Sequence, residues 1–270
     1  MGFEYMVNSI FFTDFFNNID ILMVILVRLT GFFILLPIFS GTTIPNTAKI
    51  AFILPLGIMI YSGGAVTEIS YDSNTAGLVF LLIKEFMVGL TLSFAVYTIF
   101  MTLFMAGQFM DYQIGFSMVS VFDPVTQIQV PITGNFLYML IILLLVRTGG
   151  LHAFIGVIFK SFEVLPVGTA EIFSNKFIAS YMLSLLTDYF SLGVQIAMPI
   201  VGAIFIVDIS LGLLVKAAPQ MNVFVVGMPI KLLIGLYILY YIIPVFAGVY
   251  DHLFEQSYKA VINIMGGLSP

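Results

Sequence analysis

Long apolar stretches separated by short polar ones run along almost the whole chain. Several contain no charged residue and approach the roughly 20 residues that a helix needs to cross a bilayer. These are residues 29–48, 50–67, 86–110, 124–146, 189–207 and 232–250. A shorter stretch, residues 217–230, is bounded by lysines and is predicted to be re-entrant or packed inside protein. The pattern therefore predicts an all-α polytopic membrane protein.

Prolines and charged residues within or beside these stretches make straight, lipid-facing helices unfavourable. Proline removes a backbone donor, and a charge facing lipid costs roughly 2.5–3.5 kcal/mol on insertion scales. The prolines are Pro37, Pro55, Pro131, Pro199, Pro219, Pro229 and Pro244, and the charges are Arg28, Lys84, Glu85, Arg147, Asp188, Asp208, Lys216 and Lys231. Each charge either sits at a helix end or in a local ion pair, or belongs to a polar interior or subunit interface. Together these residues predict short, bent helical hairpins packed on other protein.

Composition excludes most other classes of protein. Of the 270 residues, 61% are hydrophobic and only 9% are charged, against about 25% charged in soluble domains. The net charge of −5 provides no basic surface for nucleic acid. There is no cysteine, so disulfides and thiolate metal sites are excluded. The first residues include Glu4, Asp14 and Asp20 before any Lys or Arg, so we expect no secretory signal peptide.

The residue types that catalysis needs are not arranged as an active site requires. An aspartyl intramembrane protease needs paired carboxylates, and Asp188 and Asp208 lie outside the Gly-x-Gly-Asp pattern of such enzymes. A serine protease needs an oriented histidine, and His152 has no acidic neighbour in sequence. His152 and His252 are far apart, and no phosphate-binding glycine motif occurs. The sequence thus predicts no catalytic residue, no metal site and no cofactor.

Residues 107–131 combine features that suit neither lipid nor water. Glutamine, methionine and phenylalanine recur in this segment, and it contains Asp123-Pro124, where the residue before proline avoids helical geometry. Non-helical backbone at membrane depth is tolerated only inside protein or along a water-filled path. The segment is therefore either a loop packed against its own helices or a plug that closes a pore.

Motifs along nearly the whole chain support a resemblance to a known family. They are RLTG at 28–31, GQ at 107–108, QIG at 113–115, DP at 123–124, LPVG at 165–168, AMP at 197–199, DISLGLL at 208–214, KAAPQMNVF at 216–224 and GMPIK at 227–231. The last three are the most specific. On these motifs the chain resembles the FliR family, the flagellar biosynthesis proteins of the bacterial type III export gate, and its injectisome relatives.

The resemblance implies an architecture and a set of partners. It implies a non-enzymatic gate subunit in the bacterial cytoplasmic (inner) membrane at the flagellar basal body, assembled with FliP and FliQ and contacting FlhB. Unfolded flagellar proteins would pass through the centre of this assembly, and nucleic acid is not a partner. Residues 1–180 would form a P-like helical part that includes a plug loop at 107–123. Residues 181–270 would form a Q-like helical hairpin part, and both would pack as bent hairpins in a helical assembly.

The resemblance also implies roles for particular residues. Glycine lets backbone approach closely, and methionine and phenylalanine supply an adaptable seal. The implied pore plug contains Gln108, Gln113, Gly115, Phe116, Met118, Phe122 and Asp123. The implied subunit interface contains Pro219, Gln220, Asn222, Phe224, Pro229 and Lys231.

Two alternatives stay open on the sequence. A secondary transporter would use broken helices to bind a small solute near the bilayer midplane and would show two related halves; no such repeat is visible by inspection. The injectisome counterpart of the same gate subunit would share most of the motifs. Co-purification separates a gate from a transporter, because a gate subunit belongs to a large hetero-oligomer and a transporter runs alone or as a small homo-oligomer.

Overall fold

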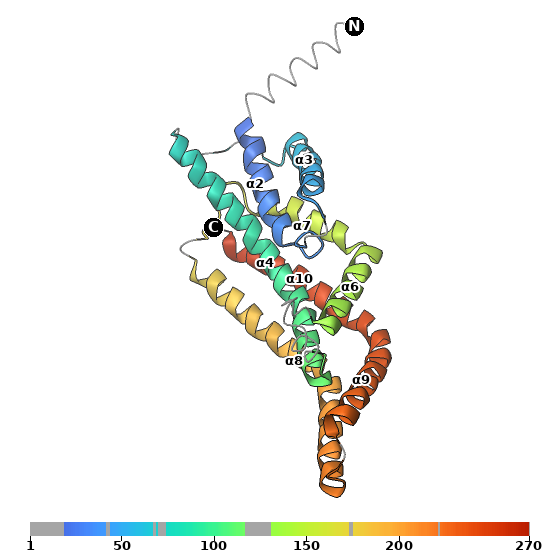
Figure 1. The fold of residues 1–270 in the computed structure, drawn as a ribbon. Coiled ribbons are helices and arrows are strands. Elements are labelled where there is room, and N and C mark those ends of the chain that lie inside the picture. Colours follow the sequence, from blue (N-terminus) through green and yellow to red (C-terminus); the bar gives the residue numbers. More distant parts are fainter. Residues whose placement is uncertain are drawn as a thin grey trace, which may run out of the picture. The chain divides into compact units, whose positions relative to one another are not determined.

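The computed structural model describes residues 19–41, 44–66, 69, 74–116, 131–172, 175–220 and 222–269. These residues form helices and the turns between them, and no strand (Figure 1). The helices are α2 (Ile19–Leu35), α3 (Asn46–Ser62), α4 (Thr75–Ile114), α6 (Ile132–Arg147), α7 (Gly150–Val164), α8 (Lys176–Ala217), α9 (Val223–Ile242), the short 3₁₀ helix η1 (Ile243–Val245) and α10 (Phe246–Leu268). The predicted all-α fold class is confirmed.

Three helical segments in the described part of the chain are long and apolar enough to cross a membrane. They are Thr75–Ile114, Lys176–Ala217 and Phe224–Leu268, the last of which joins α9, η1 and α10. The broken pair α6 and α7 makes a fourth if it is counted as one span. The chain is thus a polytopic helical protein, as predicted, and its described residues contain fewer and longer spans than the six charge-free stretches suggest.

Some predicted spans do not match the observed helices. A proline ends a helix inside one predicted span, whereas charged residues that bounded other predicted spans lie inside helices. Residues 29–48 were wrongly predicted as one span: α2 ends at Leu35, because Pro37 cannot continue the helical ladder. The N–H groups of Phe39 and Ser40 instead donate to the carbonyl of Leu36, each at 2.8 Å. Conversely, α4 runs on through Glu85 and α8 through Asp208, so these charges do not end their helices.

Proline interrupts some helices and not others. Pro37, Pro131, Pro219 and Pro244 lie in turns, at a helix start or in the 3₁₀ helix, whereas Pro55, Pro199 and Pro229 lie inside α3, α8 and α9. Helix α8 continues through its proline over 42 residues. Only part of the proline positions therefore interrupt a helix.

The chain divides into two compact units. The first consists of Met1–Tyr97, His152–Tyr181 and Tyr258–Pro270, and the second of Thr98–Leu151 and Met182–Ser257. In the first unit α2 crosses α4 at two glycines. A Cβ on Gly31 would collide with the backbone of Phe86, and a Cβ on Gly89 would lie 2.8 Å from the backbone nitrogen of Phe32. Small residues at the crossing allow the two backbones to touch.

In the second unit the end of α4 packs on α6, and α8 and α9 form a helical hairpin (Figure 1). A Cβ on Gly107 would collide with the backbone of Gly134, so α4 and α6 approach as closely as α2 and α4 do. The hairpin turns between Ala217 and Val223. The Asn222 side chain closes this turn by accepting a hydrogen bond of 3.1 Å from the N–H of Phe224.

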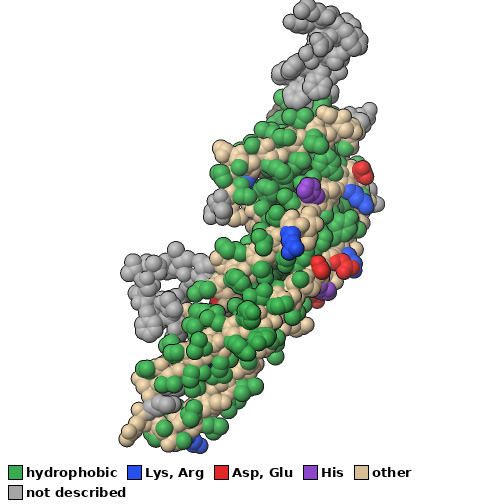
Figure 2. Space-filling view, turned by 90° about the vertical axis from the view of Figure 1, so that its right-hand side faces the viewer, with side chains coloured by type: hydrophobic (Ala, Val, Ile, Leu, Met, Phe, Trp, Pro, Cys, Tyr) green, Lys and Arg blue, Asp and Glu red, His purple; other side chains and the backbone are tan. Residues whose placement is uncertain are grey.

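Apolar side chains cover much of the outside as well as the core. Figure 2 shows a face on which hydrophobic side chains predominate and charged ones are few. On the α8–α9 hairpin, Leu183, Phe205, Leu213 and Leu233 are each more than half exposed. Surface of this kind is stable only against lipid or against other protein.

Candidate functional site

The first unit contains a buried ion pair that explains two of the charges embedded in apolar sequence. Arg28 of α2 and Glu85 of α4 are both fully buried, and Nε and Nη2 of Arg28 lie 2.6 and 2.5 Å from Oε2 of Glu85. Arg28 Nη1 also donates to the carbonyls of Ser161 and Leu165, at 3.1 and 3.0 Å, where α7 ends. The guanidinium therefore meets a carboxylate on one side and carbonyls at the end of α7 on the other.

The loop after α7 completes this polar cluster. The N–H of Gly168 donates to Glu85 Oε1 at 2.8 Å, and Lys84 Nζ donates to the carbonyl of Gly168. Arg28 of the RLTG motif and Leu165 and Gly168 of the LPVG motif thus belong to one hydrogen-bonded cluster. This cluster joins α2, α4 and the end of α7. All residues of the cluster belong to the first unit, with Arg28 and Glu85 buried and Lys84 and Gly168 partly buried, and we assign it to the scaffold.

In the second unit, the helices on either side of the predicted plug segment are held together. Both carboxylate oxygens of Asp111, on α4, accept hydrogen bonds from the N–H of Thr133, at 3.1 and 3.0 Å. Thr133 lies in the first turn of α6, which starts after Pro131 and has no side-chain cap of its own. A carboxylate at this position satisfies an otherwise unpaired N–H and complements the helix dipole.

The last turn of α4, residues 111–114, is called the loop stem here because residues 117–130 follow it. Gln113 Nε2 donates to Asp208 Oδ2 of α8 at 3.1 Å. The other oxygen of Asp208, Oδ1, forms an ion pair with Lys231 of α9. One carboxylate therefore joins the stem to both helices of the hairpin. The ion pair is partly exposed, at 33% for Asp208 and 24% for Lys231.

An apolar contact accompanies this polar one. The Ile114 side chain is buried and lies on Gly235 of α9, where an added Cβ would come within 2.7 Å of Ile114 Cγ1. Lys231 and Gly235 are one helical turn apart, so they present the same face of α9 to the stem. Gly115 then leaves the helix with a φ of 102°, a conformation that favours glycine.

Comparison with known proteins identifies the family. The family model described as "Bacterial export proteins, family 1" matches residues 19–257. The chain belongs to this family.

Several known proteins are similar to this chain over most of their length. The flagellar biosynthetic protein FliR of Bacillus subtilis (strain 168) is 29% identical over 245 residues, covering 90% of this chain and 93% of its own. FliR of Pectobacterium carotovorum subsp. carotovorum is 30% identical over 249 residues, covering 90% and 92%. The surface presentation of antigens protein SpaR of Shigella sonnei is 27% identical over 236 residues, covering 84% and 88%. The predicted membership of the FliR family is confirmed.

In this FliR-family chain the predicted plug residues fall in three places. Gln108 is exposed on α4, before the stem, and Gln113 lies in the stem itself. Gly115 and Phe116 are half-buried in the turn that follows. Met118, Phe122 and Asp123 lie outside the described residues. Residues 107–114 of the predicted plug loop continue α4, and Gly107 serves close helix packing instead of a turn.

The predicted interface residues all lie at or near the hairpin turn. Pro219 and Gln220 are exposed in the turn, Asn222 caps α9, and Phe224 is 70% exposed in the first turn of α9. Pro229 is exposed within α9, and Lys231 is the residue that pairs with Asp208. Lys231 thus has a partner within its own chain, while the others present a surface.

Asp111 and Asp208 were missed as site residues by the sequence analysis. Asp111 lies within residues 107–131. It is an acidic residue among apolar ones, and a helix that starts after a proline follows it, so the sequence did contain a signal for its role. Asp208 opens the most specific motif of the FliR family in this chain, but its partner Gln113 is 95 residues away. Only the folded chain brings these two side chains together.

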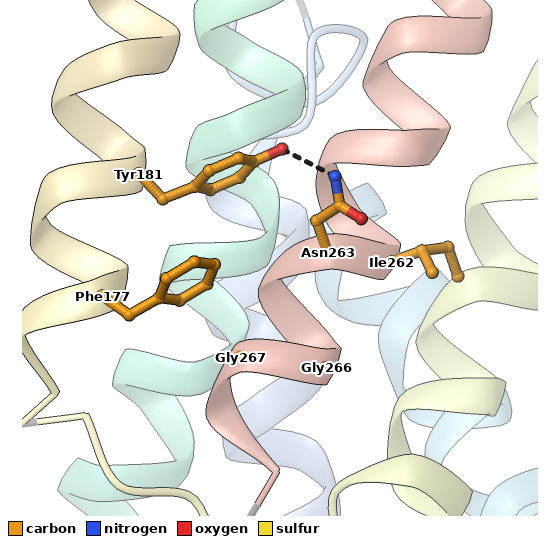
Figure 3. A pocket seen from close by; sticks show the side chains of 6 residues that line it. All are labelled: Phe177, Tyr181, Ile262, Asn263, Gly266 and Gly267. Carbon is orange, nitrogen blue, oxygen red and sulfur yellow. Dashed lines mark hydrogen bonds between the residues drawn. The ribbon is translucent and has the colours of Figure 1, made fainter.

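A pocket of about 610 Å³ lies in the first unit between the start of α8 and the end of α10. Figure 3 shows Phe177 and Tyr181 extending from α8 toward the glycine-bearing end of α10, and Asn263 donates to the Tyr181 hydroxyl at 3.2 Å. No carboxylate, histidine or lysine lines this pocket. In the described part of the chain no group of three or more His, Asp or Glu side chains could hold a metal ion.

Proposed function

We propose that this chain is a pore-forming, non-enzymatic subunit of the bacterial flagellar type III protein export gate. It lies in the inner membrane at the flagellar basal body and passes unfolded flagellar proteins. The segment that follows the loop stem closes the channel. Membership of the FliR family supports this proposal, and the observation that carries it is the pinning of α4 to α6 by Asp111 and Thr133. This contact joins the two helices that flank the predicted plug segment, which supports a plug anchored on both sides.

The gate assembles with FliP and FliQ subunits and contacts FlhB. The exposed apolar side chains of the α8–α9 hairpin support this part of the proposal, since they need partners or lipid. Residues 1–180 correspond to the P-like part and residues 181–270 to the Q-like hairpin part. The second compact unit combines residues from both parts, so the loop stem and the hairpin contact each other within one chain.

The experiment places a charge at the joint after the stem. Gly115 has a φ of 102°, and a Cβ added to it would meet no heavy atom within 4 Å. The Gly115→Asp variant therefore has room for its side chain but puts a negative charge where the channel closes. We expect altered secretion of flagellar proteins and an increased ion leak, with normal assembly of the complex. Motility and ion leak at wild-type levels would falsify the plug assignment.

Two controls separate charge from backbone strain. Gly115→Ala introduces the same left-handed strain without a charge and is expected to change the leak less. Gly64→Asp introduces a charge at another glycine with a positive φ, 68°, in the turn after α3. This variant should leave both secretion and ion leak unchanged.

The injectisome counterpart of the gate subunit is the second candidate function. The chain is 27% identical to SpaR, which is close to its 29% and 30% identity to the FliR relatives. The injectisome function is therefore kept as a candidate. Complementation decides between the two. The chain should restore motility to a strain that lacks its flagellar FliR, and restoration of injectisome secretion alone would favour the second candidate.

A further inference from the structure

We propose that the contact between Gln113 and Asp208 is a latch. It holds the loop stem on the α8–α9 hairpin while the following segment closes the pore, and it opens each time a protein is exported. This inference rests on the proposed function, and it adds the contact that must break for the plug to move.

The two oxygens of Asp208 have separate partners, which makes one contact releasable. Lys231 pairs with Oδ1 and fixes the carboxylate within the hairpin, whereas Gln113 donates to Oδ2. Departure of Gln113 leaves the ion pair intact. The carboxylate is one-third exposed, so water can replace the lost donor. The hairpin therefore keeps its structure whether or not the stem is docked.

The residues before and after the latch differ in how far they can move. Asp111 is 4% exposed and binds a backbone N–H with both oxygens, and Gly107 leaves no space between α4 and α6. That part of α4 is fixed. Gly115, in contrast, already has a positive φ, and a Cβ added to it would meet no heavy atom within 4 Å. The chain thus passes from a buried anchor, through a partly exposed contact, to a half-buried glycine with a positive φ, whose N–H donates to the Asp111 carbonyl at 3.0 Å.

Ile114 forms the apolar half of the latch. It packs on Gly235, one turn along α9 from Lys231. If the latch opens, Ile114 must leave this glycine together with Gln113, because both belong to the same helical turn. A covalent link between positions 114 and 235 would therefore keep the latch shut.

The absence of cysteine from the chain makes this link testable. The double variant Ile114→Cys/Gly235→Cys has two thiols only, and the close approach of the 235 Cβ position to Ile114 Cγ1 suits disulfide geometry. The variant is produced as the full chain in cells that lack their own copy. Oxidation with a mild thiol oxidant, and reduction afterwards, then close and reopen the link while secretion is measured.

A second pair provides the matched control. Gly193 of α8 lies against Thr102 of α4, with its Cβ position 3.5 Å from Thr102 Cγ2. The Thr102→Cys/Gly193→Cys variant therefore links α4 to the same hairpin, but well before the stem. Its oxidation should leave secretion unchanged, because that part of α4 stays in place during export.

The latch predicts that oxidation of the 114–235 pair lowers secretion by roughly tenfold or more, since the gate is held in one state, and that reduction restores it. Full cross-linking with unchanged secretion overturns the latch, and so does failure of the two thiols to react. The proposed function itself is tested by a separate experiment, deletion of the whole chain. If protein export stays intact after this deletion, the proposed function is wrong.

A side-chain variant tests the latch without a cross-link. Gln113→Leu removes the donor to Asp208 and keeps a side chain of similar length. We expect an increased ion leak with unchanged assembly, because the stem is no longer held. The control is Gln195→Leu, which removes an exposed glutamine of α8 that bonds only one turn away to Ser191. A leak that is the same in both variants overturns the proposal.

Discussion

Among single residues, Arg28 has the most demanding surroundings. Its guanidinium is fully buried between Glu85, two carbonyls at the end of α7 and the ring of Phe162, whose centre lies 4.3 Å from the guanidinium carbon. A charge in such a place must be paired, because removal of one partner leaves the other desolvated and alone.

We expect Arg28→Met to destabilise the protein by about 3–5 kcal/mol, the usual cost of breaking a buried ion pair from one side. The double variant Arg28→Met/Glu85→Met should recover much of this loss, since no unpaired charge remains. Arg147→Met, at an exposed arginine where α6 ends, is the control. Thermal unfolding of the purified protein measures all three. Equal losses in the single and double variants would argue against an ion pair as the cause.

The ion pair of Arg28 and Glu85 also shows why a charged residue was misinterpreted when only the sequence was known. Glu85 bounded a predicted span because charge commonly ends an apolar helix, yet α4 continues on both sides of it. Its partner is 57 residues away in sequence. Hydrophobic pattern reports how apolar each segment is, but it does not report which distant side chain neutralises a charge.

Among the elements, α6 depends on a residue of another helix for its start. Pro131 cannot cap α6 with a side chain, and Asp111 of α4 does so instead. The start of α6 is therefore stable only while α4 is in place. This dependence links the two helices that flank the predicted plug segment.

We expect Asp111→Ala to destabilise the first turn of α6 by about 1–3 kcal/mol, the cost of losing a buried hydrogen bond to a charged group. Asp111→Asn should cost less, because the amide oxygen can still accept a hydrogen bond from Thr133. Hydrogen exchange of the amides in that turn reports the change directly. Asp188→Ala, at an exposed position of α8, serves as control. Unaltered exchange in Asp111→Ala would show that the cap is dispensable.

Element boundaries were predictable only in part, because both the end of α2 before Pro37 and the continuation of α4 through Glu85 were missed. The resemblance to the FliR family indicated the segment around Gly115 from its motifs, and α4 does end there. The resemblance also implied a role for Gln113 in the pore plug and for Lys231 in the subunit interface, without connecting the two residues. Asp208, which connects the two, was quoted within a motif without a role, because its function is visible only when three helices meet.

For the whole molecule, the decisive quantity is the length of exposed apolar helix. At about 1.5 Å per residue, the 42 residues of α8 extend over roughly 60 Å, twice the roughly 30 Å of a hydrocarbon core. Tilts of up to about 40° do not remove such a difference. Exposed apolar side chains occur from Phe177 to Leu214, near both ends of this helix. Lipid alone therefore cannot cover α8.

The remaining apolar surface needs other protein, which leads to a prediction about size. Extracted in mild detergent, the chain should elute in a hetero-oligomer far larger than its own 29.9 kDa, and expressed without its partners it should aggregate or be degraded. Light scattering on the eluted complex, with and without co-expressed partner subunits, measures this. A stable, monodisperse monomer or small homo-oligomer would instead support the transporter alternative. The length of α8 favours the larger assembly, because a free-standing transporter would leave about half of this helix uncovered.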